Sequence, residues 1–187
     1  MNSSPTPRLV AVSTSLKAGP SASRALIEHA LASTSGMVHM QLLDLREHAL
    51  RQFDGSNVLA GPAQDLVAST IASADGLLLA VPCYWNGVSG VVKNLIDVVC
   101  GPSYDLDGPT PLAGTPVAVV VVGADSDSAR YGAEDIVRVL TAIGAEVVDR
   151  PVVVSNPRRQ PVSDLQLHSI TRLAVRLAQS SNAKALS

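Results

Sequence analysis

The sequence predicts an α/β domain of three layers, in which five parallel strands in the order 2-1-3-4-5 lie between helices. The length of 187 residues suits one domain spanning 1–187. Short runs rich in Val and Leu recur without polar alternation, as in strands that are covered on both faces. Segments with helical spacing separate these runs, so right-handed crossovers would make the sheet parallel. We expect residues 1–7 and 180–187 to be frayed.

The elements follow from these patterns in chain order. The expected strands are Arg8–Val12, Val38–Leu43, Gly76–Val81, Pro116–Val122 and Ala145–Val153. Apolar stripes predict helices around Leu26, Ile27, Ala30 and Leu31, around Leu66, Val67, Thr70 and Ile71, around Ile136, Leu140 and Ile143, and around Ile170, Leu173, Ala174 and Leu177. The third helix is the clearest, with its stripe from Val88 to Val99, Ser89 as N-cap and Gly101 as its end.

Composition excludes several function classes. With 14 Lys and Arg against 16 Asp and Glu, the net charge of −2 gives no field that would attract nucleic acid or an anionic membrane. The longest apolar runs are far shorter than the ~20 residues of a membrane helix. Cys83 and Cys100 are too few for a disulfide framework, and the N-terminus does not resemble a signal peptide, so we expect a cytoplasmic protein. The four histidines lack metal-ligand spacing, and no metal site is predicted.

The segment 13–23, after the first expected strand, is a candidate phosphate site. Open α/β sheets bind ligands at the carboxyl ends of the strands where the winding reverses, here between strands one and three. This segment combines several hydroxyl residues with Lys17 and Gly19 before a helix begins. Hydroxyls and a helix N-terminus suit a phosphate monoester, although a serine-rich turn that only caps the helix has the same composition. The chain lacks GxGxxG after this strand and GxxxxGK[ST] throughout, which disfavours Rossmann dinucleotide and P-loop sites.

Two further segments reach the same expected edge. Segment 82–90 brings Tyr84, Trp85 and Asn86 together with two glycines, which suits a flat heterocycle or else a packed aromatic pair. Segment 123–132 is small and polar, and could fold over the pocket or form a solvated connection.

Segment 82–97 resembles the recurring PxYxxxxxGxxKNxxD segment of the NADPH-dependent FMN reductase family, which is flavodoxin-like. The matching residues are Pro82, Tyr84, Gly90, Lys93, Asn94 and Asp97. The first loop is similar to the family's GSxRxxSxN phosphate loop, with Thr14 where Gly is expected and Lys17 where Arg is usual. The resemblance extends from Arg8 to about Val153.

The resemblance implies noncovalent FMN, NAD(P)H stacking on its exposed face, and a dimer or tetramer. The implied phosphate-side residues are Ser13, Ser15, Lys17, Ser21 and Ser23. The implied ring-side residues are Pro82, Cys83, Tyr84, Trp85 and Asn86, with Gly123 and Ala124 nearby. Because the flavin is itself the electrophile in hydride transfer, we name no obligate catalytic side chain. Arg158 and Arg159 suit an NADPH 2′-phosphate, another subunit or a solvated pair, and the last is favoured.

The leading function is therefore an FMN-dependent NAD(P)H oxidoreductase that supplies a partner monooxygenase or free flavin. Lys17 in place of Arg gives up bidentate phosphate contact, which favours this flavin-shuttling version. The alternative keeps FMN bound and reduces a quinone, azo, nitro or natural-product substrate. A flavodoxin-type electron carrier is the non-enzyme alternative, although such carriers are usually strongly acidic. A phospho-receiver domain is strongly disfavoured, because its acidic residues and lysine are missing at the strand ends.

Overall fold

The computed structural model of the protein describes residues 6–56, 61–104 and 108–185. Its sheet has the strand order β2-β1-β3-β5-β6. The pairings along this path are parallel, β7 pairs with β5 beyond β6, and β4 is antiparallel to β3. With β6 and β7 counted as two parts of one strand, the expected order 2-1-3-4-5 is confirmed. The strands are β1 (Leu9–Ser13), β2 (Met40–Asp44), β3 (Gly76–Tyr84), β4 (Gly87–Val88), β5 (Pro116–Gly123), β6 (Glu146–Val147) and β7 (Val152–Ser155).

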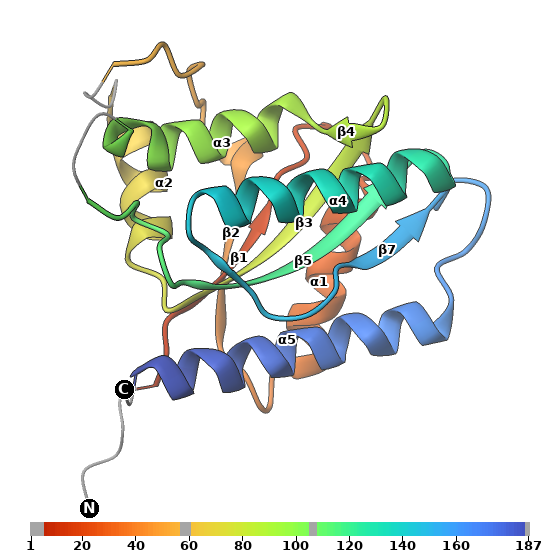
Figure 1. Cartoon of the computed structure of the whole chain (residues 1–187). Helices are drawn as coiled ribbons and strands as arrows, with labels where there is room; N and C mark the ends of the chain where they lie inside the picture. Colours follow the sequence, from red (N-terminus) through yellow and green to blue (C-terminus); the bar gives the residue numbers. More distant parts are fainter. Residues whose placement is uncertain (1–5, 57–60, 105–107, 186–187) are drawn as a thin grey trace, which may run out of the picture.

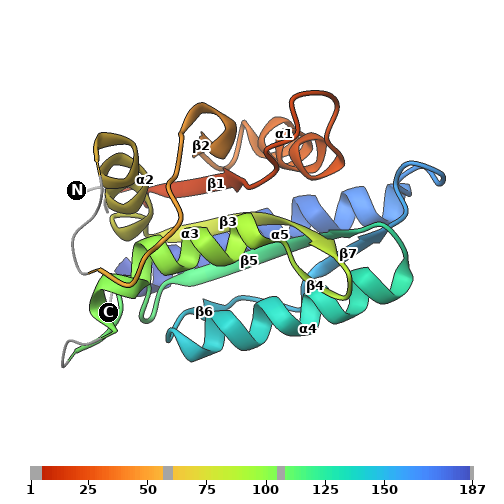
Figure 2. The same ribbon diagram turned by 90° about the horizontal axis from the view of Figure 1, so that it is seen from above.

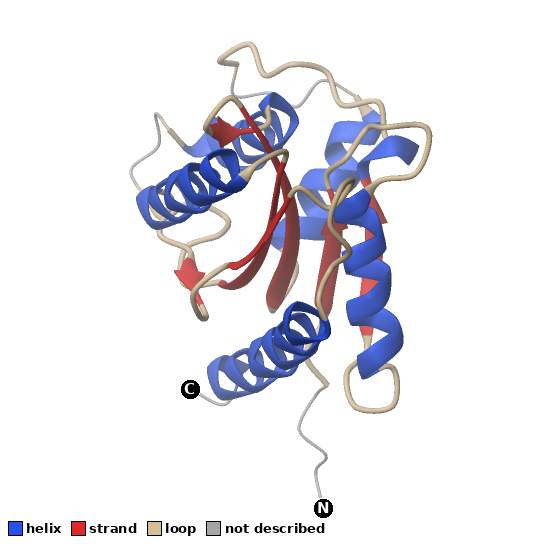
Figure 3. Ribbon diagram, turned by 90° about the vertical axis from the view of Figure 1, so that its right-hand side faces the viewer, coloured by secondary structure: helices blue, strands red, loops and turns tan. Residues whose placement is uncertain are grey.

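Helices cover both faces of the sheet, as Figures 1 and 3 show. They are α1 (Ala22–Thr34), α2 (Pro62–Ala72), α3 (Gly90–Cys100), α4 (Ser126–Ala142) and α5 (Asp164–Ala185), with short 3-10 turns η1 (Leu45–Glu47) and η2 (Gly101–Ser103). Helices α1 and α5 form one apolar core with the sheet, and α2, α3 and α4 form the other. Along β1, Leu9 and Ala11 face the first core while Val10 and Val12 face the second. Burial on both faces explains the continuous apolar runs in the sequence.

The start of the third helix differs from the prediction. Val88 belongs to β4, where it pairs with Cys83, and the helix begins at Gly90. Ser89 is the N-cap residue by position, but its side chain makes no capping bond and its Oγ is buried without a partner. Gly101 is the C-cap, as expected. The apolar stripe was continuous across the strand end and the helix, so spacing alone did not reveal the hairpin between them.

The fifth expected strand, Ala145–Val153, is interrupted. Val147 pairs with Val117 and Val152 with Val120, so the segment between these pairs is longer than its partner on β5. Pro151 lies in this surplus segment, and proline has no N–H for the ladder. The strand therefore resumes as β7 only after the proline.

Two ends of elements also differ from expectation. The segment 123–132 is mostly helix, because Asp125 caps α4 through a bond from Ser128 N to its carboxylate (2.7 Å). Helix α5 continues through the tail from Ser180 that the sequence predicted as frayed, and Ser181 there is buried. The expected frayed residues 1–5 and 186–187 lie outside the described residues.

None of the described helices is long and apolar enough to cross a membrane.

Candidate flavin site

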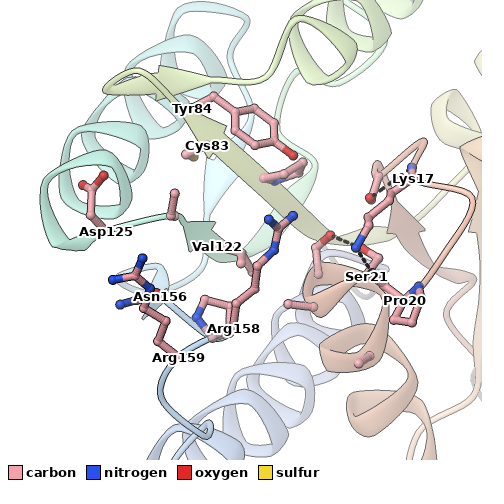
Figure 4. Close-up of a pocket in the computed structure, with 18 residues that line it drawn as sticks. Lys17, Pro20, Ser21, Cys83, Tyr84, Val122, Asp125, Asn156, Arg158 and Arg159 are labelled. Atoms are coloured by element: carbon pink, nitrogen blue, oxygen red, sulfur yellow. Dashed lines mark hydrogen bonds between the residues drawn. The ribbon is translucent and has the colours of Figure 1, made fainter.

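A pocket of about 820 Å³ opens at the carboxyl ends of β1, β3, β5 and β7. It lies where the winding of the sheet reverses, as the sequence predicted, and its volume falls in the ~300–1,000 Å³ range of ligand pockets. Four segments line it: the loop before α1, the end of β3, the end of β5 and the turn after β7 (Figure 4). The walls thus come from parts of the chain that are far apart in sequence.

The loop before α1 forms one wall and ends at a helix N-terminus. Ser21 is the N-cap of α1, and its Oγ accepts a bond from Arg24 N at 3.5 Å. The hydroxyls of Ser21 and Ser23 lie 3.1 Å apart, and Ser15 lines the same wall. The first N–H groups of a helix have no intrahelical acceptor, so hydroxyls beside them suit an anion.

The base of this loop is fixed to the sheet, while its cation is only loosely engaged. Thr14 is buried and its Oγ1 donates to the carbonyl of Ala80 on β3 at 2.6 Å. Lys17 is exposed, and its Nζ donates to the carbonyl of Pro20 at 2.6 Å. An exposed ammonium can turn from a neighbouring carbonyl to a phosphate at little cost, so Lys17 can serve as the loop's counter-charge.

Two arginines near this loop, Arg24 and Arg46, form ion pairs with the buried carboxylate of Asp44. Asp44, at the end of β2, is 2% exposed and accepts from the guanidinium of Arg46 at 2.8 and 3.0 Å. Arg24 of α1 pairs with the same carboxylate. A buried carboxylate needs such partners to offset its desolvation. The Arg24 guanidinium therefore connects α1 to the end of β2, and the Arg46 guanidinium stabilises the turn that follows β2. Lys17 is the cation of the loop that lines the pocket.

The end of β3 turns back through a tight hairpin. Trp85 and Asn86 have φ of +52° and +62°, the conformation of a two-residue type I′ turn. Left-handed backbone is common for Asn but unusual for Trp, whose side chain is 98% exposed here. Tyr84 is half-exposed and lines the pocket beside Pro82 and Cys83. The hairpin thus presents an aromatic ring to the pocket and a second one to solvent.

Helix α4 holds this hairpin in place, and Figure 2 shows the two elements side by side. Any Cβ at Gly132 would overlap the Cys83 side chain, so glycine permits the close approach of helix and strand. Val88 N donates to the Asp135 carboxylate at 3.2 Å, and Ser128 Oγ lies 3.4 Å from Asn86 Oδ1. The position of Tyr84 is therefore set by contacts on the far side of the hairpin.

Cys83 is a packing residue in this arrangement. Burial raises the pKa of its thiol to about 12, and the charge of Asp135 adds to the effect. A thiol with such a pKa is protonated at neutral pH, whereas reactive cysteines have lowered pKa values. The surroundings of Cys83 therefore favour a structural role over a redox role.

The fourth wall, which the sequence did not predict, is the turn after β7. Asn156 has φ of +51°, and its N–H donates to the carbonyl of Gly123 at 2.9 Å. The chain then folds back, with Arg159 N donating to the carbonyl of Asn156 at 3.0 Å. Arg158 and Arg159 both line the pocket, although the sequence favoured a solvated pair. Figure 4 shows Arg158 extending from this wall toward Tyr84.

Comparison with known families shows the family of the chain. The model of the NADPH-dependent FMN reductase family matches residues 7–158. The chain belongs to this family. FMN and NAD(P)H, the cofactors that the sequence resemblance implied, are thus confirmed at the level of the family, as is an oxidoreductase activity. No sequence among curated proteins matches the chain significantly.

Solved structures share the fold at low sequence identity. An oxidoreductase from Corynebacterium diphtheriae has a TM-score of 0.73 at 20% identity, covering 94% of this chain and 97% of that one. An NADH:FMN oxidoreductase has 0.71 at 21%, covering 94% and 90%. The NAD(P)H:acceptor flavoenzyme of Paracoccus denitrificans has 0.70 at 16%, covering 92% and 97%. A flavone reductase matches at 14% with a TM-score of 0.69, and this chain spans 62% of its length. These likenesses confirm the flavodoxin-like fold.

The residues of this FMN reductase family member fit a phosphate-bearing flavin. Hydroxyls and a helix N-terminus lie at one end, and the ring of Tyr84 lies at the other. Of the twelve residues that the sequence proposed for FMN, most lie on the pocket wall: Ser15, Lys17, Ser21, Ser23, Pro82, Cys83, Tyr84, Gly123 and Ala124. Ser13 is fully buried on β1 and is not part of the wall, and Trp85 and Asn86 belong to the hairpin turn beyond it.

Several residues that line the pocket were not singled out from the sequence. Some come from the α1 and β5 walls, namely Pro20, Ala22, Ala25, Val122 and Asp125, and the others, Asn156 and Pro157, come from the turn after β7, where Arg158 and Arg159 were expected to be solvated. The rule that parallel strands end at one edge applies to the last strand as well. The turn after it was therefore the signal that could have found Asn156 and the two arginines.

Proposed function

We propose that this protein transfers hydride from NAD(P)H to FMN held in the 820 Å³ pocket and passes the electrons to a partner monooxygenase or to free flavin. The observation that supports this most is the pairing of an anion-binding loop with an aromatic hairpin across one pocket at the winding reversal of the sheet. FMN supplies the hydride acceptor when bound, and the protein supplies binding and orientation.

In this proposal the two ends of the pocket have different tasks. The α1 N-terminus, the hydroxyls of Ser15 and Ser21, and Lys17 hold the phosphate. Pro82 and Tyr84 pack against the ring. The N–H groups of Trp85 and Asn86 have no backbone partner in the described part of the chain, so they can donate to the polar edge of the ring. Such donors favour the charged, reduced ring.

The acceptor divides the proposal into two versions. Lys17 binds phosphate as a single point charge, and its Nζ contacts only the Pro20 carbonyl among the described residues. This favours weak FMN binding and release of the reduced flavin. A tightly bound FMN that reduces a quinone, azo, nitro or natural-product substrate is the alternative version. We also propose a homo-oligomer in the cytoplasm, where the free thiols of Cys83 and Cys100 would stay reduced.

The test of the function is the visible spectrum of the purified protein under anaerobic conditions. We expect flavin bands near about 370 and 450 nm after addition of FMN, and their loss when NADPH is added. Bleaching that requires excess free FMN supports the shuttle version, and bleaching of bound FMN alone supports the alternative version. A protein that binds no FMN at any concentration, or binds it without bleaching by either nicotinamide nucleotide, would contradict the proposal.

A substitution tests the phosphate end separately. Lys17→Gln should weaken FMN binding about tenfold, because one charge-assisted contact is lost, and should leave the unfolding midpoint unchanged. Flavin fluorescence quenching measures the dissociation constant. Lys93→Gln is the matched control, since Lys93 pairs with Asp97 on the surface of α3 and does not line the pocket. Equal FMN affinity in the wild type and the Lys17 variant would exclude Lys17 from the phosphate site.

A further inference from the structure

Two arginines on the wall opposite the loop before α1 have side chains that are unpaired within the described part of the chain. Within residues 6–56, 61–104 and 108–185, the guanidinium groups of Arg158 and Arg159 make neither an ion pair nor a hydrogen bond. Both are exposed, and both line the pocket. By contrast, Arg24 and Arg46 are paired with Asp44.

The backbone nevertheless fixes where these arginines stand. Asn156 N is bonded to Gly123 O at the end of β5 (2.9 Å), and the N–H groups of Arg159 and Gln160 both donate to Asn156 O at 3.0 Å. Asn156 takes the left-handed conformation that this reversal requires. The turn is therefore anchored to a central strand, and the two guanidinium groups are presented from a defined position.

The charge balance of the pocket points to a second anion. Its cations are Lys17 on the α1 side and the two arginines on the β7 side, and its one acidic lining residue is Asp125. The Asp125 carboxylate is already engaged by Ser128, accepting from its N at 2.7 Å and its Oγ at 3.2 Å. The pocket is thus cationic at two opposite walls, in a chain with a net charge of −2.

One flavin phosphate cannot occupy both walls. If FMN binds with its phosphate in the α1 loop, the cations across the pocket are left for the other ligand of the reaction, as Figure 4 shows for Lys17 and Arg158. NADPH differs from NADH by a 2′-phosphate, which is a monoester anion. Guanidinium groups bind such anions with paired hydrogen bonds, and two adjacent arginines can do so from one turn.

We infer that Arg158 and Arg159 bind the 2′-phosphate of NADPH and so make the enzyme prefer NADPH to NADH. This inference rests on the proposed function for the identity of the two ligands. It assigns the turn after β7 a role in the choice of nucleotide, separate from the FMN contacts of the α1 loop. The turn therefore sets specificity through binding and takes no part in hydride transfer.

Binding to the FMN-loaded protein tests this without turnover. Isothermal titration with NADP⁺ and NAD⁺ compares the wild type with the double variant Arg158→Gln/Arg159→Gln. We expect the dissociation constant of NADP⁺ to rise about tenfold or more, since charge-assisted bonds are lost, while that of NAD⁺ changes less than about twofold. The Arg158→Lys/Arg159→Lys variant should recover part of the NADP⁺ affinity. In steady state, KM for NADPH should rise in the glutamine variant with kcat unchanged.

Controls separate this inference from its alternatives. Arg150→Gln, at the other end of β7 and outside the pocket, should leave all affinities as in the wild type. Equal losses for NADP⁺ and NAD⁺ would overturn the inference in favour of a pyrophosphate contact, and a loss of FMN affinity alone would overturn it in favour of the flavin phosphate. A wild type that binds NADP⁺ through these arginines but never reduces FMN would uphold the inference while the proposed function fails.

Discussion

Cys83 sits at the point where strand, helix and pocket meet, and it shows how a single residue is constrained from several sides. It is fully buried, it packs against Gly132 of α4, and its neighbour Tyr84 lines the pocket. Burial raises the pKa of its thiol to about 12 and that of the Cys100 thiol to about 11. Each thiol is therefore held in its neutral form by the fold.

These raised pKa values predict a loss of stability at alkaline pH. Because the folded-state pKa lies above the unfolded value of 9.0, the stabilisation is complete below pH 9 and is lost as pH rises toward 11 or 12. Each thiol should contribute a slope of about 1.4 kcal/mol per pH unit in that window. Urea unfolding with reductant at several pH values measures it.

Cys100→Ala provides the comparison, since Cys100 lies at the end of α3 and does not line the pocket. Its free energy of unfolding should fall less steeply above pH 9 than that of the wild type, because one titrating thiol is gone. Other alkaline titrations are common to both proteins and cancel in the difference. Identical slopes in the two proteins would contradict the pKa assignment for Cys100.

At the scale of elements, the turn of the β3–β4 hairpin has a strained backbone at Trp85, and burial of the Trp85 side chain does not compensate for this strain. Trp85 holds φ of +52° while its side chain is almost fully exposed. Left-handed backbone costs a residue with a Cβ on the order of 1–2 kcal/mol. A strained and exposed aromatic residue next to a pocket is typical of a functional site rather than a packing site.

The prediction for this element is that Trp85→Gly stabilises the fold by about 1 kcal/mol, since glycine accepts positive φ and little packing is lost. Chemical denaturation of the FMN-free protein measures the change. Trp85→Ala retains the Cβ and removes the indole, so its stability should stay near that of the wild type. If the alanine variant were strongly destabilised, Trp85 would have to pack against another surface, such as a second copy of the chain.

At the scale of the whole molecule, a second hollow of about 690 Å³ is lined in part by Leu16 and Ala18 of the loop before α1. Apolar side chains predominate among those that line it, including Leu16, Leu45, Leu50 and Val91. Leu16 is 54% exposed, although it adjoins loop residues of the flavin pocket. The hollow is also lined by Gly90 and Val91 at the start of α3, a helix whose only charged residues are Lys93 and Asp97.

We therefore expect the protein to be a homo-oligomer that contacts its copy through this hollow, and Val91→Glu to shift it toward the monomer by burying a charge. Light scattering across a concentration series measures the mass. Leu165→Glu, at an exposed position on α5, is the matched control and should keep the assembly of the wild type. A wild type that is monomeric at every concentration would rule out the assembly.

The sequence alone determined the fold class, the strand order and most of the first two pocket walls. It could do so because buried parallel strands read as apolar runs and because the ends of parallel strands meet at one edge. The segment 82–97 also carried the family resemblance that the family model confirmed.

Only the tertiary structure decided the contacts between segments remote in sequence. Three examples join distant parts of the chain. Gly132 approaches Cys83 closely, Arg24 forms an ion pair with Asp44, and Arg158 lies on the pocket wall. Local periodicity reports which face of an element is buried, and it carries no information about which exposed residue another segment brings nearby. The sequence therefore predicted a solvated arginine pair, and only the tertiary structure shows that the turn after β7 faces the loop before α1 across one pocket.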